Sequence, residues 1–292
     1  MAEIVRIGMS DWTGGNPSES TRHDALQALE SGKVIVFTEL RFPAHEIEHL
    51  IGVDTGFANA KNISFDIATG KLGGIDEGFA EKKSLASVMA RYATLSRALI
   101  VELFPLYAAG LRTGRTSFRP AEISTRKTSW RKDDSRLHVD SFPATPVQGE
   151  RILRVFTNVN PAEEPRSWRT GEPFEKVAAR FLPSLHAPVP GSGALLRWLG
   201  VTRSRRSPYD HFMLKLHDAM KADDAYQSRA EQAEFDFPPG SSWLVYTDQV
   251  SHAAMKGRWA FEQTFYLPVE SMADAATSPL RTLERLMNRR LA

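Results

Sequence analysis

Residues 137–142 read LHVDSF, and this short stretch decides how the rest of the chain is interpreted. It places His138 and Asp140 two positions apart, so that both side chains point to the same face of an extended strand. An imidazole and a carboxylate presented together are two of the three ligands in the 2-His-1-carboxylate triad of non-heme Fe(II) oxygenases. That triad leaves three iron positions open, two for the keto acid of 2-oxoglutarate and one for O2.

A second histidine completes the pattern. The H-x-D pair alone is a weak signal in a chain with eight histidines. His252, however, lies between a predicted strand at 242–246 and another at 259–267. A histidine between the last two strands is where a double-stranded β-helix carries its distal iron ligand. The sequence therefore predicts an Fe(II) site made of His138, Asp140 and His252, with 2-oxoglutarate and O2 as cosubstrates.

The far carboxylate of 2-oxoglutarate needs a cation, ideally the planar fork of an arginine. Arg258 opens the strand after the distal histidine and is the first candidate. Arg154 is the second, because alternation along its strand places it on one face with Asn158, which becomes a further candidate for the cosubstrate site. The alternative for either arginine is a surface salt bridge.

The apolar pattern predicts a mainly β fold with flanking helices. A helix-rich part covers about residues 1–115, and short β-rich pieces separated by turn residues at about 116–270 predict a double-stranded β-helix, or jelly-roll, core. We expect residues 1–292 to form a single dioxygenase domain. The predicted strands are 120–130, 151–159, 194–199, 241–247 and 259–267, and the predicted helices are 22–31, 43–51, 83–109, 208–222 and 279–292.

The composition excludes several classes of protein. The chain has no cysteine, which excludes disulfides, thiolate metal sites and a cysteine nucleophile. Its net charge of +2 gives no indication of a nucleic-acid partner. No apolar run is long enough to cross a bilayer and the N-terminus lacks a secretory pattern, so we expect a cytoplasmic protein. The oligomeric state is left open.

A second metal motif competes with the first. His45, Glu46 and His49 form an H-E-x-x-H pattern, which on a helix can present two histidines to zinc with the glutamate as general base. The longer metzincin pattern needs a histidine at position 55, where this chain has Thr55. A zinc metalloprotease is therefore the weaker alternative, and an ordinary surface helix is the better interpretation of the segment.

Five blocks of the sequence resemble the Kdo hydroxylases, Fe(II)/2-oxoglutarate-dependent dioxygenases that act on 3-deoxy-D-manno-octulosonic acid (Kdo) in lipopolysaccharide. The resemblance implies that His138, Asp140 and His252 bind iron. It also implies hydroxylation at C3 of a Kdo on a lipid A precursor, giving a Ko-type sugar together with succinate and CO2. The blocks are RKTSWRKDDSRLHVDSFPATP (126–146), which is the most specific, KNISFD (61–66), RILRVFTNVNP (151–161), SPYDHFMLKLHDAMKADDAYQ (207–227) and SWLVYTDQVSHAA (242–254).

An acidic, lipid-anchored sugar calls for basic contacts. We expect Arg126, Arg131 and Arg136, which crowd the segment before the H-x-D pair, to bind the carboxylate and phosphate groups of this substrate. The cosubstrate arginine of the wider superfamily commonly lies near the positions that Glu262 and Gln263 hold here, so the choice of anchor stays open. The functional alternative from another class is a non-catalytic β-sandwich that binds anionic glycans.

Two further features concern the membrane. The tail, residues 279–292, predicts a basic helix with an apolar stripe made of Leu280, Leu283, Met287 and Leu291. Such a helix can lie in the interface of an anionic bilayer, so we expect peripheral contact with the cytoplasmic face of the inner membrane. The alternative is that the stripe packs on the β core. A second basic cluster, at 197–206, is either a partner site or a solvated face.

Overall fold

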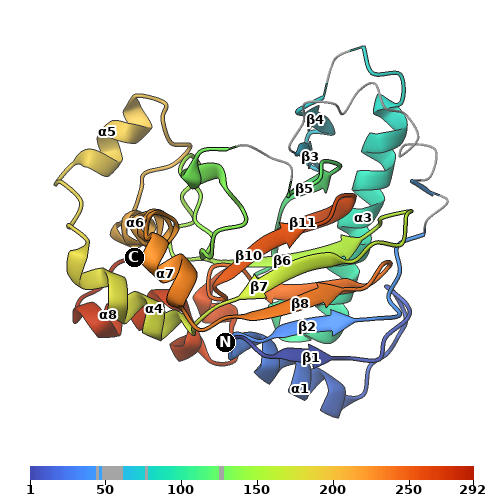
Figure 1. The fold of residues 1–292 in the computed structure, drawn as a ribbon, viewed down its shortest axis with the longest axis horizontal. Helices are drawn as coiled ribbons and strands as arrows, with labels where there is room; N and C mark the ends of the chain where they lie inside the picture. The colour runs from blue at the N-terminus through green and yellow to red at the C-terminus, as the bar shows by residue number, and fades with distance from the viewer. Residues whose placement is uncertain (44–45, 48–61, 76–77, 125–127) are drawn as a thin grey trace.

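The computed structural model describes residues 1–43, 46–47, 62–75, 78–124 and 128–292. Two facing sheets form the centre of the described part (Figure 1). Every neighbouring pair of strands is antiparallel except the first, β1 and β2, which is parallel. In sheet order, the larger sheet contains β1 (Ile4–Arg6), β2 (Val34–Phe37), β9 (Ser242–Tyr246), β6 (Arg151–Asn158), β11 (Ala260–Leu267), β5 (Arg112–Arg119), β3 (Ile63–Asp66) and β4 (Lys71–Gly73). The smaller sheet contains, in order, β10 (His252–Lys256), β7 (Arg166–Thr170) and β8 (Ala233–Phe237).

The larger sheet is covered on both faces, which explains why its central strands read as continuous buried runs. All eight residues of β6 are buried, and so are all eight of β11. One face packs against the smaller sheet through an aromatic cluster that includes Phe156, Trp168 and Trp243. The other face packs against the long helix α3 (Lys82–Leu103), whose Tyr92 hydroxyl donates to the carbonyl of Val155 at 3.2 Å.

Helices gather at one end of the two sheets, on the left in Figure 1. The helix α6 begins where Ser207 and Asp210 form a reciprocal capping box with Pro208 at the first position. The helices at this end are α4 (Phe174–Phe181), α5 (Ser192–Trp198), α6 (Pro208–Ala222), α7 (Asp224–Arg229) and α8 (Pro279–Met287). The helix α1 (Glu19–Glu30) instead packs beside α3, against β2 and β9. Short 3-10 turns lie at Pro105–Tyr107, Trp130–Lys132, Leu182–Ser184, Val269–Ser271 and Ala275–Thr277.

The structure corrects two of the predicted strands. Residues 194–199 are helical, because Gly191 turns the chain at φ 79° and starts α5 directly after it. The predicted strand at 120–130 is also wrong: β5 ends at Arg119, just before Pro120, and Trp130 begins a 3-10 turn. The predicted helix at 43–51 falls mostly outside the described residues.

The C-terminal helix α8 does not offer its apolar stripe to a membrane. Leu280, Leu283 and Leu291 are buried and Met287 is packed against the same core, so the alternative of a core-packing tail is the correct one. Burying these side chains removes apolar surface from water, which stabilises the fold and leaves the predicted stripe unable to insert into lipid. No helix in the described part of the chain is long and apolar enough to cross a membrane.

Candidate metal centre

Backbone hydrogen bonds bring the two distant histidines together. His138 and His252 each donate a backbone N–H to the carbonyl of the other, at 3.0 and 2.9 Å, so the H-x-D segment pairs with the start of β10 at the edge of the smaller sheet. The backbone N–H of Asp140 donates to the carbonyl of Thr247 at 2.8 Å. The pairing of this segment with β10 thus brings all three predicted ligands to one space.

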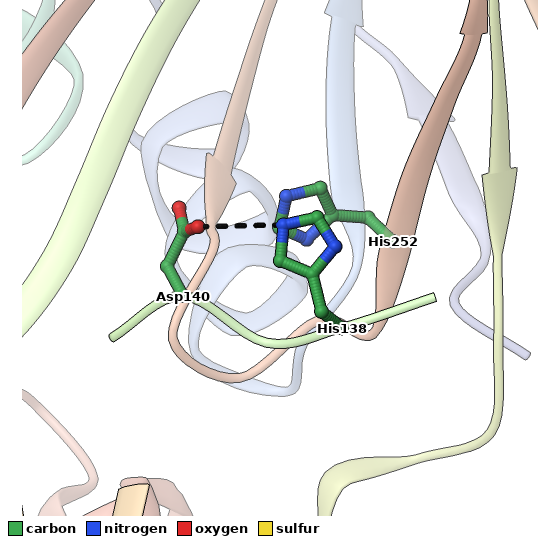
Figure 2. Close-up of side chains that lie close together, drawn as sticks. All are labelled: His138, Asp140 and His252. Carbon is green, nitrogen blue, oxygen red and sulfur yellow. Dashed lines mark ion pairs between the residues drawn. The ribbon is translucent and has the colours of Figure 1, made fainter. Parts of the chain in front are cut away.

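The three side chains converge (Figure 2). One ligand atom from each of His138, Asp140 and His252 lies within 4.8 Å of the others, and all three residues are buried. The Asp140 Oδ1 atom lies 3.7 Å from Nε2 of His138. An ion placed among the three would reach all of them at ordinary coordination distances of about 2.0–2.2 Å after only small side-chain movements.

The hydrogen bonds of the imidazoles fix which nitrogen faces the centre. Nδ1 of His138 lies 2.8 Å from the carbonyl of Arg136, and Nδ1 of His252 lies 2.8 Å from the carbonyl of Val250. A carbonyl only accepts, so both Nδ1 atoms carry a proton and both Nε2 atoms keep a free lone pair. This is the tautomer that a metal site needs.

The local electrostatics also favour a cation. Burial lowers the pKa of His138 and of His252, which keeps both imidazoles neutral. Burial opposes ionisation of Asp140, but the positive charge of Arg154 acts against it, and the pKa of this carboxyl lies well below its usual range. Two neutral imidazoles and one carboxylate with open space beside them match the facial triad of non-heme Fe(II) sites, so the residues present fit that metal.

Arg154 is the predicted cosubstrate residue that the structure brings to this centre. Its Nη1 atom lies 3.1 Å from Oδ2 of Asp140 and 3.1 Å from Oε1 of Glu262. The contact with Asp140 is an ion pair without hydrogen-bond alignment, since Oδ2 is buried without a hydrogen-bond partner in the described part of the chain. The Nε of Arg154 is buried without one as well.

A cavity of about 440 Å³ opens beside Arg154. Its lining contains three arginines, Arg115, Arg119 and Arg154, and one glutamate, Glu262. Arg119 donates from Nε to Glu262 at 2.8 Å, and Arg115 donates to the hydroxyl of Ser64 at 3.3 Å. The cavity therefore carries a surplus of positive charge next to the triad.

Neither of the other two cosubstrate candidates lies at the triad. Arg258 is exposed in the turn before β11, and its guanidinium lies 4.4 Å from the centre of the Trp259 ring. The Asn158 amide donates to the carbonyls of Glu164 and Phe237, and so fastens a loop at the far end of β6.

Two of the predicted substrate arginines, Arg131 and Arg136, pair with acidic residues of α6 and α7. Arg131 is exposed, stacks 4.1 Å from the centre of the Trp130 ring and forms an ion pair with Asp218 at 3.6 Å. Arg136 pairs with Asp224. Arg126 lies outside the described residues. In the rival motif, His45 and His49 also lie outside them, while Glu46 pairs with Arg91 at 2.7 Å.

Several residues around the centre carry no motif in the sequence. Gln227 accepts from the backbone N–H of Leu137 at 2.7 Å and donates to its carbonyl at 3.0 Å, which holds the H-x-D segment in place. The Trp168 ring stacks on His252 with 5.1 Å between ring centres. Burial lowers the pKa of His217, which packs edge-on against His138, to about 4. Among the residues near the centre that were not predicted, Arg115 and Arg119 could have been found from their spacing. They alternate with Ser117 along β5, so the three side chains share one face of the strand.

Comparison with protein families gives a match over residues 13–290 to the family described as 3-deoxy-D-manno-oct-2-ulosonic acid (Kdo) hydroxylase. The chain belongs to the Kdo hydroxylase family. The crystal structure of the Kdo hydroxylase KdoO in complex with alphaketoglutarate and Fe(III), described as a non-heme Fe(II) alphaketoglutarate dependent dioxygenase, has 44% sequence identity and a TM-score of 0.94. The match covers 99% of this chain and 97% of that one.

Other crystal structures of the same Kdo hydroxylase agree. The complex with cobalt(II) has 45% identity and a TM-score of 0.94, and the complex with succinate and Fe(III) has 44% identity and a TM-score of 0.93. Both matches also cover 99% of this chain and 97% of the other. Comparison with curated proteins gave no match. The predicted family, the double-stranded β-helix fold and the Fe(II)/2-oxoglutarate dioxygenase class are thereby confirmed.

Proposed function

We propose that this Kdo hydroxylase hydroxylates C3 of a Kdo sugar on a lipid A precursor. One oxygen atom of O2 enters the sugar and the other enters succinate, while 2-oxoglutarate loses CO2. The observation that carries the proposal is the buried convergence of His138, Asp140 and His252 in a member of this family. A non-catalytic glycan-binding protein would have no need for these three residues to converge.

The two histidines and the aspartate contribute different ligand groups to the metal site. His138 and His252 offer neutral Nε2 atoms, and Asp140 offers a carboxylate that stays ionised at every physiological pH. Iron held there, with 2-oxoglutarate and O2, supplies the oxidising power that breaks an unactivated C–H bond. The protein positions that bond and excludes water from the buried space.

The cosubstrate and the sugar both carry carboxylates, and the arginine-lined cavity suits them. Of the two arginines proposed as anchor, Arg154 has the better position, because it lines this cavity beside Asp140. Its buried, unpartnered Nε indicates an acceptor that arrives with the ligand. Arg115 and Arg119 extend the positive lining outward, and Arg131 and Arg136 are proposed to meet the remaining anionic groups of the glycolipid.

We also propose that residues 1–292 work as one dioxygenase domain at the cytoplasmic face of the inner membrane. We propose no nucleic-acid partner. The modest net charge of +2 supports the last point.

The test is mass spectrometry of Kdo-lipid A after incubation with the enzyme, Fe(II), 2-oxoglutarate and ascorbate. We expect a gain of one oxygen atom, located by fragmentation at C3 of a Kdo residue, with one succinate formed per oxygen inserted. Asp140→Ala is the matched control and should give no product. Oxygen inserted elsewhere in the sugar, or succinate formed without any modified sugar, would contradict the proposed position or substrate.

A further inference from the structure

The segment around α5, residues 189–206, exposes an unusual amount of apolar surface. Trp198 is 81% exposed, and Val189, Leu195, Leu199 and Val201 are each more than half exposed. These five side chains make up most of the large apolar groups exposed in the described part of the chain. In Figure 1, α5 stands at the periphery of the helical end, away from both sheets. Leu195, Trp198 and Leu199 are three and four residues apart and so share one face of the segment, and exposed apolar groups gathered in this way mark a surface that meets a partner.

The same segment is strongly basic. Arg197, Arg203 and Arg205 are exposed, and within the described residues none of the three forms an ion pair. The sequence has no aspartate or glutamate between Glu175 and Asp210. The apolar patch therefore lies inside a field of uncompensated positive charge.

The α5 segment is fastened to the wall of the arginine-lined cavity. The backbone N–H of Arg203 donates to the carbonyl of Ala144 at 2.9 Å, and the Arg206 guanidinium donates to the carbonyl of Pro143 at 2.7 Å. Pro143 and Ala144 both line the cavity beside the triad. Whatever the α5 segment touches is consequently held close to the mouth of this cavity.

We propose that the α5 segment docks on the surface of an anionic lipid bilayer. Trp198 and Leu199 enter the interfacial layer, where tryptophan is favoured, and the neighbouring arginines meet lipid phosphates. The cavity mouth then faces the headgroups. The inference rests on the proposed function in one respect: a lipid-anchored sugar explains why docking is useful. It assigns membrane contact to α5 in place of α8, whose apolar stripe is buried.

Charge complementarity favours a bilayer over a protein partner. Exposed arginines that lack acidic neighbours suit a continuous anionic surface, whereas protein interfaces usually place charges of both signs in register. A bilayer interface also accepts an exposed tryptophan without a shaped pocket, because the indole ring has an apolar body and a polar N–H.

The experiment measures binding of the purified full-length protein to phosphatidylcholine vesicles, with and without phosphatidylglycerol, by flotation. We expect binding only to the anionic vesicles, and weaker binding at high salt. The triple variant Arg197→Gln/Arg203→Gln/Arg205→Gln should bind about 100-fold more weakly, from about fivefold per arginine. The double variant Trp198→Ser/Leu199→Ser should lose at least about tenfold. Leu106→Ser, which changes another exposed leucine far from α5, should bind like the unaltered protein.

Two further measurements make the outcomes distinguishable. All variants should oxidise a water-soluble, delipidated Kdo saccharide at the same rate, which shows that they are folded and that the catalytic site is intact. If the unaltered protein binds vesicles but leaves this saccharide unchanged, docking stands and the proposed function fails. Vesicle binding that survives in both variants would overturn the inference. So would a protein that is dimeric in sedimentation without lipid and becomes monomeric in the double variant, because the patch would then be a protein interface.

Discussion

Replacing Arg154 with methionine tests how much the buried ion pairs behind the metal ligands stabilise the protein. The arginine lies 3.1 Å from a carboxylate oxygen of Asp140 and 3.1 Å from one of Glu262, and all three side chains are largely buried. At an effective dielectric constant of about 20, each contact is an attraction of about 5 kcal/mol before desolvation. Methionine keeps the stem but removes the charge. Glu262 keeps Arg119 as a partner, while Asp140 loses its principal cation.

The expected net cost is about 3–5 kcal/mol, because the desolvation of the arginine itself is recovered when it is removed. The assay is urea unfolding of the metal-free protein at neutral pH. Arg258→Met is the matched control: it removes an exposed guanidinium and should cost less than about 1 kcal/mol. Arg154→Lys keeps the charge and should fall between the two.

The same variant has a second readout. The positive charge of Arg154 helps to hold the pKa of Asp140 low, so its removal raises that pKa and makes protons compete with metal for the carboxylate. The affinity for Co(II), measured by calorimetry, should fall more steeply as the pH is lowered in Arg154→Met than in Arg258→Met, where only the histidine ligands compete for protons. Equal unfolding midpoints for the two variants, with equal Co(II) affinities, would refute the reasoning.

Three other predictions follow from the same geometry. Alanine at His138, Asp140 or His252 should abolish both turnover and bound iron while leaving the circular dichroism spectrum unchanged; iron retained at full stoichiometry in any of them would contradict the ligand assignment. Gln227→Ala frees the backbone of the H-x-D segment and should weaken Co(II) binding about 10–100-fold, whereas Gln227→Glu should weaken it less; an unchanged affinity would remove Gln227 from the site. Burial lowers the pKa of His138, His252 and His217, so unfolding takes up protons once the pH is below the usual value of 6.5. The metal-free protein should therefore lose up to about 1.4 kcal/mol of stability per pH unit for each histidine as the pH falls below about 6.5 toward the lowered pKa values. A urea midpoint that stays constant or rises on acidification would contradict this sign.

The parts of the molecule that could be predicted from the sequence are those with a strong local signal. The two-residue spacing of His138 and Asp140 fixes a shared face in any extended strand, and the structure uses that face. The apolar periodicity of α3 is equally local, although the helix ends at Leu103, before Pro105, and not at the predicted residue 109. The choice of His252 also succeeded, because the predicted strands on both sides of it placed it between β9 and β11.

The parts that could not be predicted depend on tertiary contacts. The α5 segment contains a short apolar run of a kind found in both strands and helices. It forms a helix because of the glycine turn before it and because it lies outside the sheets. Arg258 and Arg154 look equivalent along the chain, but one lies in an exposed turn and the other between two carboxylates. The role of Gln227 rests on a contact across 90 residues that no local pattern encodes.

The reciprocal backbone bonds between His138 and His252 have a consequence for how the protein matures. During synthesis the nascent chain at first holds only two of the three metal ligands, because His252 leaves the ribosome after β9 and β10 can pair only then. Contacts so far apart in the chain are slow to form and belong to the late steps of folding. Metal therefore loads onto a chain whose C-terminal strands have already docked, and a prematurely terminated chain lacking β10 has no stable place to hold it.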